Sequence, residues 1–198
     1  KIYKKILFKY IYMEHQESQY LNLIRDILDK GSFEEGRNGR TKSIFGYSMR
    51  FSLKDNTIPL LTTKKVAWKT CFHELIWFIR GKTDNNLLNE KNVHIWDGNG
   101  SREFLDSRGL NNNEVNDLGP VYGHQWRNFN APYTNCHDNY RGKGVDQLQN
   151  IINLLKDPKE RTSRRLILSA WNPCQLEEMA LPPCHVLMQF NVRDNNYL

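Results

Sequence analysis

The most constraining feature of the sequence is an alternation from Cys184 to Val192 that follows directly on two prolines. Every second residue is apolar on one face, and the other face is mostly polar. Because side chains alternate between the two faces of a strand, this pattern predicts a strand with only one face in the core. Pro182 and Pro183 restrict the backbone before it, so we expect the strand to open at the cysteine.

Further elements follow from the spacing of apolar residues. A second alternation, from Phe45 to Leu53, predicts another half-buried strand, and residues 164–171 predict a third. Helical spacing predicts helices over residues 20–28, 68–81 and 145–155. Residues that end or break helices follow or close these three segments, namely Gly31, Gly81 and Pro158.

The predicted helix over residues 68–81 is apolar around most of its circumference, so we expect it to be buried. Glu74 lies within it, and a carboxylate in such a place needs a partner or a chemical role. The residues alone leave open whether it pairs with a buried arginine, faces a wet edge or takes part in chemistry. The polar region from Asn89 to Tyr140 carries aromatic residues at intervals, which is typical of an ordered functional loop.

The end of the sequence predicts an unfinished sheet. Residues 193–196 are typical of a hairpin turn, and Tyr197 and Leu198 would begin the returning strand. At the other end, Met13 stands just before the first helix. We therefore expect a leader or linker of unknown role over residues 1–13 and one domain over residues 14–198.

The composition argues against several classes of protein, including membrane, secreted and metal-binding proteins. No run approaches the roughly 18 apolar residues of a membrane span, and no signal peptide is evident, so we expect a cytoplasmic protein without a membrane partner. The four cysteines form no C-x-x-C pair and match no zinc spacing, which indicates reduced thiols and no metal site. The net charge of +6 favours anionic ligands, but no motif supports nucleic-acid binding.

Cys184 is the candidate nucleophile. A cysteine in a rigid corner, followed by His185, can be presented to a ligand, and nearby arginines would lower the pKa of its thiol. The alternative is a small buried hydrophobe. Arg164 and Arg165 open the preceding predicted strand, where adjacent side chains point to opposite faces. They cannot both serve one site on their own subunit if that strand is regular.

Several motifs in a fixed order carry a resemblance to a known family. They include Pro59 to Lys64, Ile95 to Ser101 and Asp117 to Gly123, together with Ser169 to Pro173 and Met179 to His185. With Ser43 to Gly46, Glu74 to Phe78 and Gln125 to Arg127, they resemble thymidylate synthase across about residues 14–198. The segment Gly144 to Gln149 and the Asn99-Gly100-Ser101 form resemble the eukaryotic-type branch.

The resemblance implies an α+β fold with a mixed β-sheet packed by helices, whose C-terminal part lies beyond Leu198. It also implies the reductive methylation of dUMP to dTMP, in which the Cys184 thiolate adds to C6 of dUMP. The methylene group and the hydride would come from 5,10-methylenetetrahydrofolate. Further catalytic positions carried over from the family are Glu74, Tyr122, Asn99 and His185.

The family's binding residues can also be placed. Ile95 and Trp96 match positions beside the folate, and Arg37 matches the arginine of the loop that binds the dUMP phosphate. That loop is one residue shorter than usual, which leaves Arg40 as an alternative. Arg164 and Arg165 match the pair that reaches the partner subunit's phosphate, so the resemblance implies a homodimer.

The sequence stops before the family's Gln-Arg-Ser segment, its base-reading asparagine and its C-terminal lid. We therefore expect these 198 residues alone to be inactive and to bind dUMP weakly. Two alternatives stay open at this point. One is a degenerate, non-catalytic interaction protein, and the other is a pyrimidine hydroxymethylase of the same fold.

Overall fold

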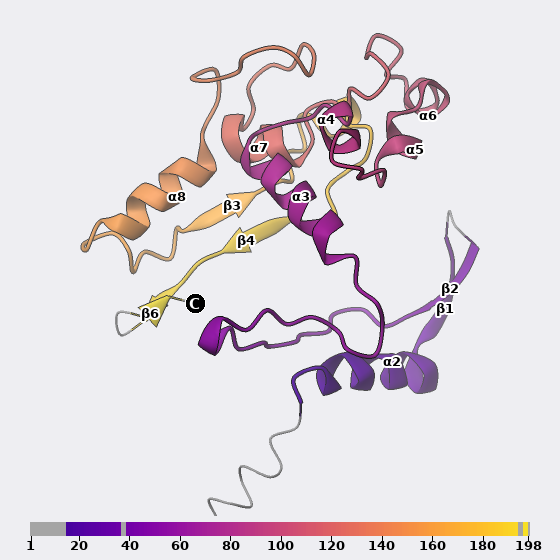
Figure 1. Ribbon diagram of the computed structural model, residues 1–198, viewed down its shortest axis with the longest axis vertical. Helices are drawn as coiled ribbons and strands as arrows, with labels where there is room; N and C mark the ends of the chain where they lie inside the picture. The colour runs from indigo at the N-terminus through magenta and orange to yellow at the C-terminus, as the bar shows by residue number, and fades with distance from the viewer. Residues whose placement is uncertain (1–14, 37–38, 194–195, 198) are drawn as a thin grey trace, which may run out of the picture. The chain divides into compact units, whose positions relative to one another are not determined.

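The computed structural model describes residues 15–36, 39–193 and 196–197, with side chains up to Arg193 (Figure 1). The chain divides into two compact units, Lys1–Ala67 and Trp68–Leu198. The leader expected over residues 1–13 lies outside the described residues. No helix that the structure describes is both long enough and apolar enough to cross a membrane.

The first unit opens with a helix and a hairpin. Helix α2 (Ser18–Lys30) confirms the first predicted helix, and Gly31 ends it by donating its N–H to Ile27 O at 3.0 Å. Strands β1 (Ser32–Gly36) and β2 (Gly39–Ser43) pair antiparallel, from Ser32 opposite Ser43 to Gly36 opposite Gly39. Arg37, predicted to bind phosphate, lies between them and outside the described residues.

The predicted strand from Phe45 to Leu53 is wrong, because this segment pairs with no strand among the described residues. Two glutamine side chains, one in α2 and one just before it, bond to the backbone of the Phe45–Leu53 segment instead. Gln19 donates to Arg50 O at 2.6 Å and accepts from Arg50 N at 2.8 Å, and Gln16 accepts from Ser52 N. The alternate apolar side chains stay 37–103% exposed, so alternation alone did not make a half-buried strand here.

Glu17 fastens the start of α2 to a later segment of the same unit. Its side chain is buried and accepts four hydrogen bonds, from the backbone N–H and the hydroxyl groups of Thr62 and Thr63, at 2.5–2.9 Å. These bonds, those of the Thr62 and Thr63 hydroxyls first, lower the pKa of Glu17 from 4.5 to about 2. The anchor is therefore ionised at neutral pH.

Replacing Glu17 by Gln is expected to loosen residues 57–67 at neutral pH, because an amide cannot accept all four bonds. A folded pKa below the unfolded one stabilises the unit above about pH 4.5, and this contribution is lost as the pH falls toward 2. Hydrogen exchange of this segment in both proteins checks it. The excess exchange of E17Q should shrink as the pH drops below about 4.5. Equal protection of residues 57–67 in both proteins at neutral pH would contradict the proposed role of Glu17 in holding this segment.

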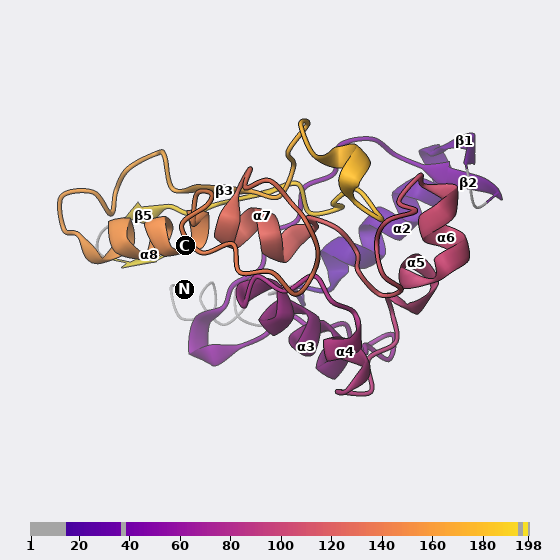
Figure 2. The same cartoon turned by 90° about the horizontal axis from the view of Figure 1, so that it is seen from above.

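The second unit is built around helix α7 (Tyr122–Asn128), of which five residues are buried. It packs against α3 (Trp68–Ile79) and against α8 (Gln147–Lys156), and α8 in turn packs against β3 (Ile167–Ser169). Figure 2 shows α7 between α8 and two short helices, α5 (Asp97–Gly100) and α6 (Arg102–Ser107). The single turn α4 (Asn86–Asn89) follows α3.

The strands of this unit are shorter than predicted. β3 pairs antiparallel with β4 (Leu187–Gln189), and β5 (Val192–Arg193) pairs with β6 (Asn196–Tyr197). The second pair confirms the hairpin predicted at the end of the sequence. Helices with small sheets confirm the α+β class, although the described strands form three antiparallel pairs rather than one mixed sheet.

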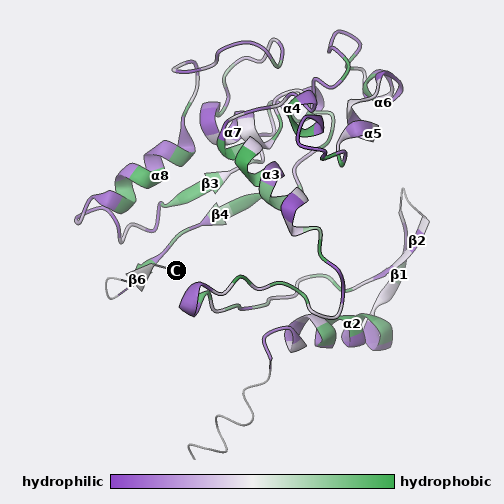
Figure 3. Cartoon of the chain, viewed as in Figure 1, coloured by the Kyte–Doolittle hydropathy of each residue, from purple (hydrophilic) through white to green (hydrophobic). Residues whose placement is uncertain are grey.

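Apolar residues from these helices and strands form the core, and Figure 3 shows the hydrophobic colour gathering on β3, β4 and part of α3. Helix α3 is less buried than its composition predicted. Trp77 and Phe78 are 4% and 2% exposed, whereas Trp68 and Phe72 near its start are both 52% exposed. Only the C-terminal half of α3 therefore belongs to the core of this unit.

Candidate active site

Cys184 ends a segment, residues 180–184, that hydrogen-bonds to α7 and to the chain just before it. The segment is held to the core where Ala180 N donates to Leu118 O at 3.0 Å, and Pro183 is buried. The backbone N–H of Cys184 donates to the Tyr122 hydroxyl at 2.5 Å. The cysteine itself is exposed. The thiol is thus exposed directly after the two prolines, whereas strand β4 starts only at Leu187, so the prediction that the strand opens at the cysteine is wrong.

Aromatic rings of α3 and α7 pack against this segment at His185. The Tyr122 ring lies 4.5 Å from the His185 ring and 4.5 Å from the Phe78 ring, measured between centroids. Phe78 and His185 also meet edge to face, at 5.7 Å. Burial raises the pKa of Tyr122, so its hydroxyl stays protonated at neutral pH. Cys184 and His185 therefore share one aromatic platform built from α3 and α7.

Glu74 joins the same cluster through Trp96. The Trp96 indole N–H donates to Glu74 Oε1 at 2.7 Å, and the Trp96 ring lies 6.3 Å from that of Tyr122. The partner of this helix carboxylate is therefore an indole rather than an arginine. Five predicted site residues from four separate segments come together in this way: Glu74, Trp96, Tyr122, Cys184 and His185.

Two other predicted residues are near this group in the chain. Asn99 lies on α5, three residues after Trp96, and is half-buried. Ile95 is 52% exposed beside the buried Trp96, which leaves apolar surface for a flat ring.

The arginine pair is placed differently from the prediction. Arg164 and Arg165 are exposed and lie in a turn before β3, so they do not open the strand. The carbonyl of Arg164 accepts from Gln189, at the end of β4 that is remote from Cys184. Within this chain they therefore do not neighbour the thiol, so the prediction of arginines beside Cys184 is wrong for its own chain. Arg40, the alternative to Arg37, lies on β2 in the first unit and contacts Glu35 and Phe33.

The other cysteines differ from Cys184 in their surroundings. Cys136 is half-buried, and burial together with the Asp117, Asp84 and Glu114 carboxylates raises the pKa of its thiol to about 12. A thiol with so high a pKa is a poor nucleophile. Cys71 and Cys174 are exposed, but neither has the tyrosine contact that fixes Cys184.

Sequence reasoning gave no role to a buried amide network behind the thiol segment. Gln125, Asn172 and Gln175 are at most 5% exposed and bond to one another at 2.9–3.2 Å. Gln125 also donates to Pro120 O, and Gln175 donates to Ala131 O. A fully satisfied polar network in the core fixes a unique geometry. The sequence could have pointed to this network, because two of its residues, Gln125 and Asn172, lie within the motifs that carry the family resemblance.

The arrangement suits conjugate addition. An exposed thiol at a fixed position can attack a polarised double bond and leave again, because sulfur is a soft nucleophile and a good leaving group. A protonated tyrosine hydroxyl and a carboxylate lie within the same cluster, where they can donate and accept hydrogen bonds.

Comparison with known proteins identifies the family that this site resembles. The sequence profile described as "Thymidylate synthase" matches residues 18–198. The chain is 56% identical over 186 residues to the bifunctional dihydrofolate reductase-thymidylate synthase of Leishmania major, covering 93% of this chain and 35% of that protein. It is 55% identical over 186 residues to the probable thymidylate synthase of Schizosaccharomyces pombe, covering 92% and 29%. The bifunctional protein of Zea mays is 53% identical over 187 residues, covering 94% and 35%. The chain thus spans about a third of the length of these relatives.

Proposed function

Since this chain belongs to the thymidylate synthase family, we propose that its protein converts dUMP to dTMP by reductive methylation with 5,10-methylenetetrahydrofolate. The observation that carries the proposal is the meeting of Cys184, Tyr122, Trp96 and Glu74 in one cluster. Retention of this set also speaks against a degenerate, non-catalytic protein.

Cys184 forms the covalent bond in this proposal. Its thiolate adds to C6 of the uracil ring, and the electron pair of the C5–C6 double bond moves to C5 as an enolate. The folate supplies a methylene group to C5. C5 then loses its proton while the bond from the methylene group to the folate nitrogen breaks, which leaves an exocyclic methylene and tetrahydrofolate. A hydride from tetrahydrofolate adds to this methylene, the C5–C6 double bond re-forms and the carbon–sulfur bond breaks, so that dTMP and dihydrofolate are released. Tyr122 holds the backbone of Cys184 throughout, because its hydroxyl accepts the Cys184 N–H.

The remaining predicted residues position the reactants in this proposal. Ile95 and Trp96 provide an apolar surface for the folate ring, and Asn99 and His185 contact the pyrimidine. Arg164 and Arg165 are exposed and remote from the thiol of their own chain, which supports a homodimer in which they bind the partner's dUMP phosphate. Whether Arg37 or Arg40 adds to that phosphate site stays a prediction. We also propose a cytoplasmic location.

The test is the release of tritium from dUMP labelled at C5, by the protein produced from its natural gene, with 5,10-methylenetetrahydrofolate present. Release that depends on the folate and yields dTMP is expected, because C5 must lose its hydrogen when it gains carbon. The same assay with dCMP tests the pyrimidine hydroxymethylase alternative. Turnover of dCMP without turnover of dUMP would replace the proposed substrate.

Replacing Glu74 by Gln is expected to lower turnover by about 10²-fold or more, the range typical of lost acid–base catalysis. Glutamine keeps an oxygen that can accept from Trp96 at the position now 2.7 Å away, so the fold and the cluster are retained. Steady-state kinetics and thermal unfolding of the same preparation separate the two roles. An active E74Q enzyme would show that Glu74 serves only to hold Trp96.

A further inference from the structure

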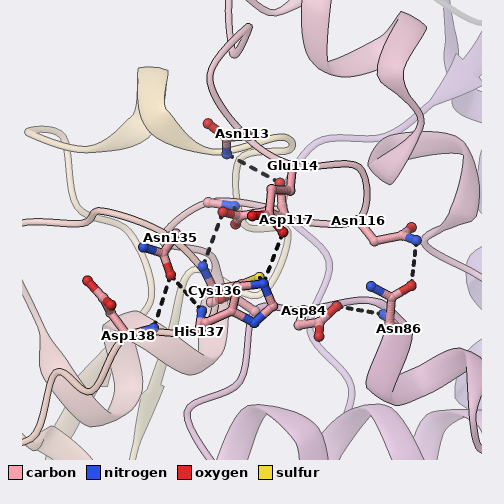
Figure 4. A network of polar contacts seen from close by, with 12 residues as sticks. Asp84, Asn86, Asn113, Glu114, Asn116, Asp117, Asn135, Cys136, His137 and Asp138 are labelled. Carbon is pink, nitrogen blue, oxygen red and sulfur yellow. Dashed lines mark hydrogen bonds and ion pairs between the residues drawn. The ribbon is translucent and has the colours of Figure 1, made fainter.

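A cluster of metal-ligating side chains lies in the second unit and involves none of the five residues in the cluster that contains Cys184. Asp84, Cys136 and His137 each offer one ligand atom, and these atoms lie within 4.8 Å of one another. The Cys136 Sγ and His137 Nε2 atoms are 3.6 Å apart. Figure 4 shows Cys136 and His137 beside Asp84, with Glu114 next to them.

The backbone around this cluster is fixed by hydrogen bonds. Asp84 and Asp117 are paired in an isolated β-bridge, and the buried Asp117 carboxylate accepts from Cys136 N at 3.1 Å. Asp117 also accepts from the Tyr133 hydroxyl at 2.6 Å. The Asn135 side chain accepts from His137 N at 2.9 Å and thereby closes a turn around Cys136. These hydrogen bonds therefore hold the donor-bearing segments in place.

A hydrogen bond also orients the Asp84 side chain. One of its oxygens, Oδ1, accepts from Asn86 N at 2.8 Å, at the start of α4. A carboxylate has two oxygens and about four lone-pair positions, so this bond leaves capacity for a metal. The cluster thus joins the chain just after α3 to the loop that carries Cys136.

The donor set and its spacing fit a tetrahedral ion. Zinc binds thiolate sulfur at about 2.3 Å and imidazole nitrogen or carboxylate oxygen at about 2.0–2.2 Å, so neighbouring ligands lie roughly 3.3–3.8 Å apart. The observed 3.6 Å between Cys136 Sγ and His137 Nε2 falls in this range. Glu114 Oε2 is 3.0 Å from the same nitrogen, a hydrogen-bond distance, so Glu114 neighbours the three ligands without being one of them.

We propose that Asp84, Cys136 and His137 bind one divalent cation of the zinc class, with a water molecule as the fourth ligand. The ion takes the place of the thiol proton. Because its ligands come from separate segments, the ion links residue 84 to residues 136–137. Its role is structural, since the thiol proposed to react is Cys184.

The test titrates the metal-free protein with Co²⁺ alone and then with Zn²⁺. Co²⁺ is expected to bind one per chain, with a thiolate-to-cobalt charge-transfer band, and Zn²⁺ should displace it. The C136S variant should lose the band, and H137Q should weaken binding by more than the roughly 10–100-fold that changes outside the ligand set cause. His137 is exposed, so this variant keeps the fold even if C136S does not.

The matched controls are two other cysteines. C174S removes an exposed thiol outside the cluster, and C184S removes the proposed nucleophile. Both should keep the band, and C136H should bind Co²⁺ one to one without it. Absence of Co²⁺ binding in the parent protein, or a charge-transfer band that persists in C136S, would overturn the site. A band lost in C184S would assign the metal to the thiol segment instead.

Discussion

Replacing Cys184 by Ala is expected to reduce dUMP turnover by at least about 10⁴-fold while leaving dUMP affinity nearly unchanged. The thiol is the one group in the cluster that can form and break a bond to C6. The fold should persist, because the bonds that fix this position come from the backbone: Cys184 N donates to Tyr122, and Ala180 N donates to Leu118. Alanine keeps both the N–H and the prolines before it.

Two measurements check this result on the protein produced from its natural gene. Tritium release from C5-labelled dUMP reports the covalent chemistry, and calorimetry with dUMP reports binding. C174A is the matched control, since Cys174 is equally a free, exposed cysteine. It should retain full turnover. Retained tritium release in C184A would mean that another group attacks C6, and a large loss of dUMP affinity would mean that Cys184 acts in binding.

The sequence allowed most of this cluster to be predicted, because its residues belong to dense local motifs. Tyr122, Cys184 and His185 were assigned from runs of adjacent residues, and the structure brings them within one aromatic platform. What no local pattern could supply is the partner of Glu74. The indole of Trp96 reaches it from a segment 22 residues away, a contact that only tertiary packing creates.

The strand predictions that failed also have local causes. The alternation from Phe45 to Leu53 indicated a strand, but a strand also needs a backbone partner, and glutamine side chains at α2 take that place. Arg164 and Arg165 were placed on a strand that begins only at Ile167. In each case the order of side chains left the hydrogen bonding of the backbone undetermined.

The metal cluster illustrates a different limit. Zinc templates in sequences depend on short, regular spacings between ligands. Asp84 and Cys136 are far apart in the chain and meet only because Asp117 bridges the two segments. Four cysteines without a template therefore indicated no metal, whereas the folded chain offers three ligand atoms within 4.8 Å.

The largest effect on stability is expected from G119A. Gly119 has φ +74°, and a Cβ placed there would lie 2.0 Å from Glu178 O, which no rotation of a side chain can relieve. Its N–H donates to Asp117 Oδ1 at 3.0 Å, and next to it Leu118 O accepts from Ala180 N. Residues 117–119 thus lie directly against the segment that leads to Cys184, so displacement by a new methyl group moves the thiol.

Gly109 provides the matched control, because it has nearly the same backbone angle, φ +78°, and a methyl group added there would meet nothing within 4 Å. G109A should cost about 1 kcal/mol, the strain of a left-handed non-glycine residue. G119A adds a backbone clash and should cost at least about 3 kcal/mol, enough to deplete folded protein in a marginally stable domain. Urea unfolding of both variants measures the difference, and turnover should fall in G119A alone. Equal midpoints for the two would show that the 117–119 and 178–180 segments are not packed together as described.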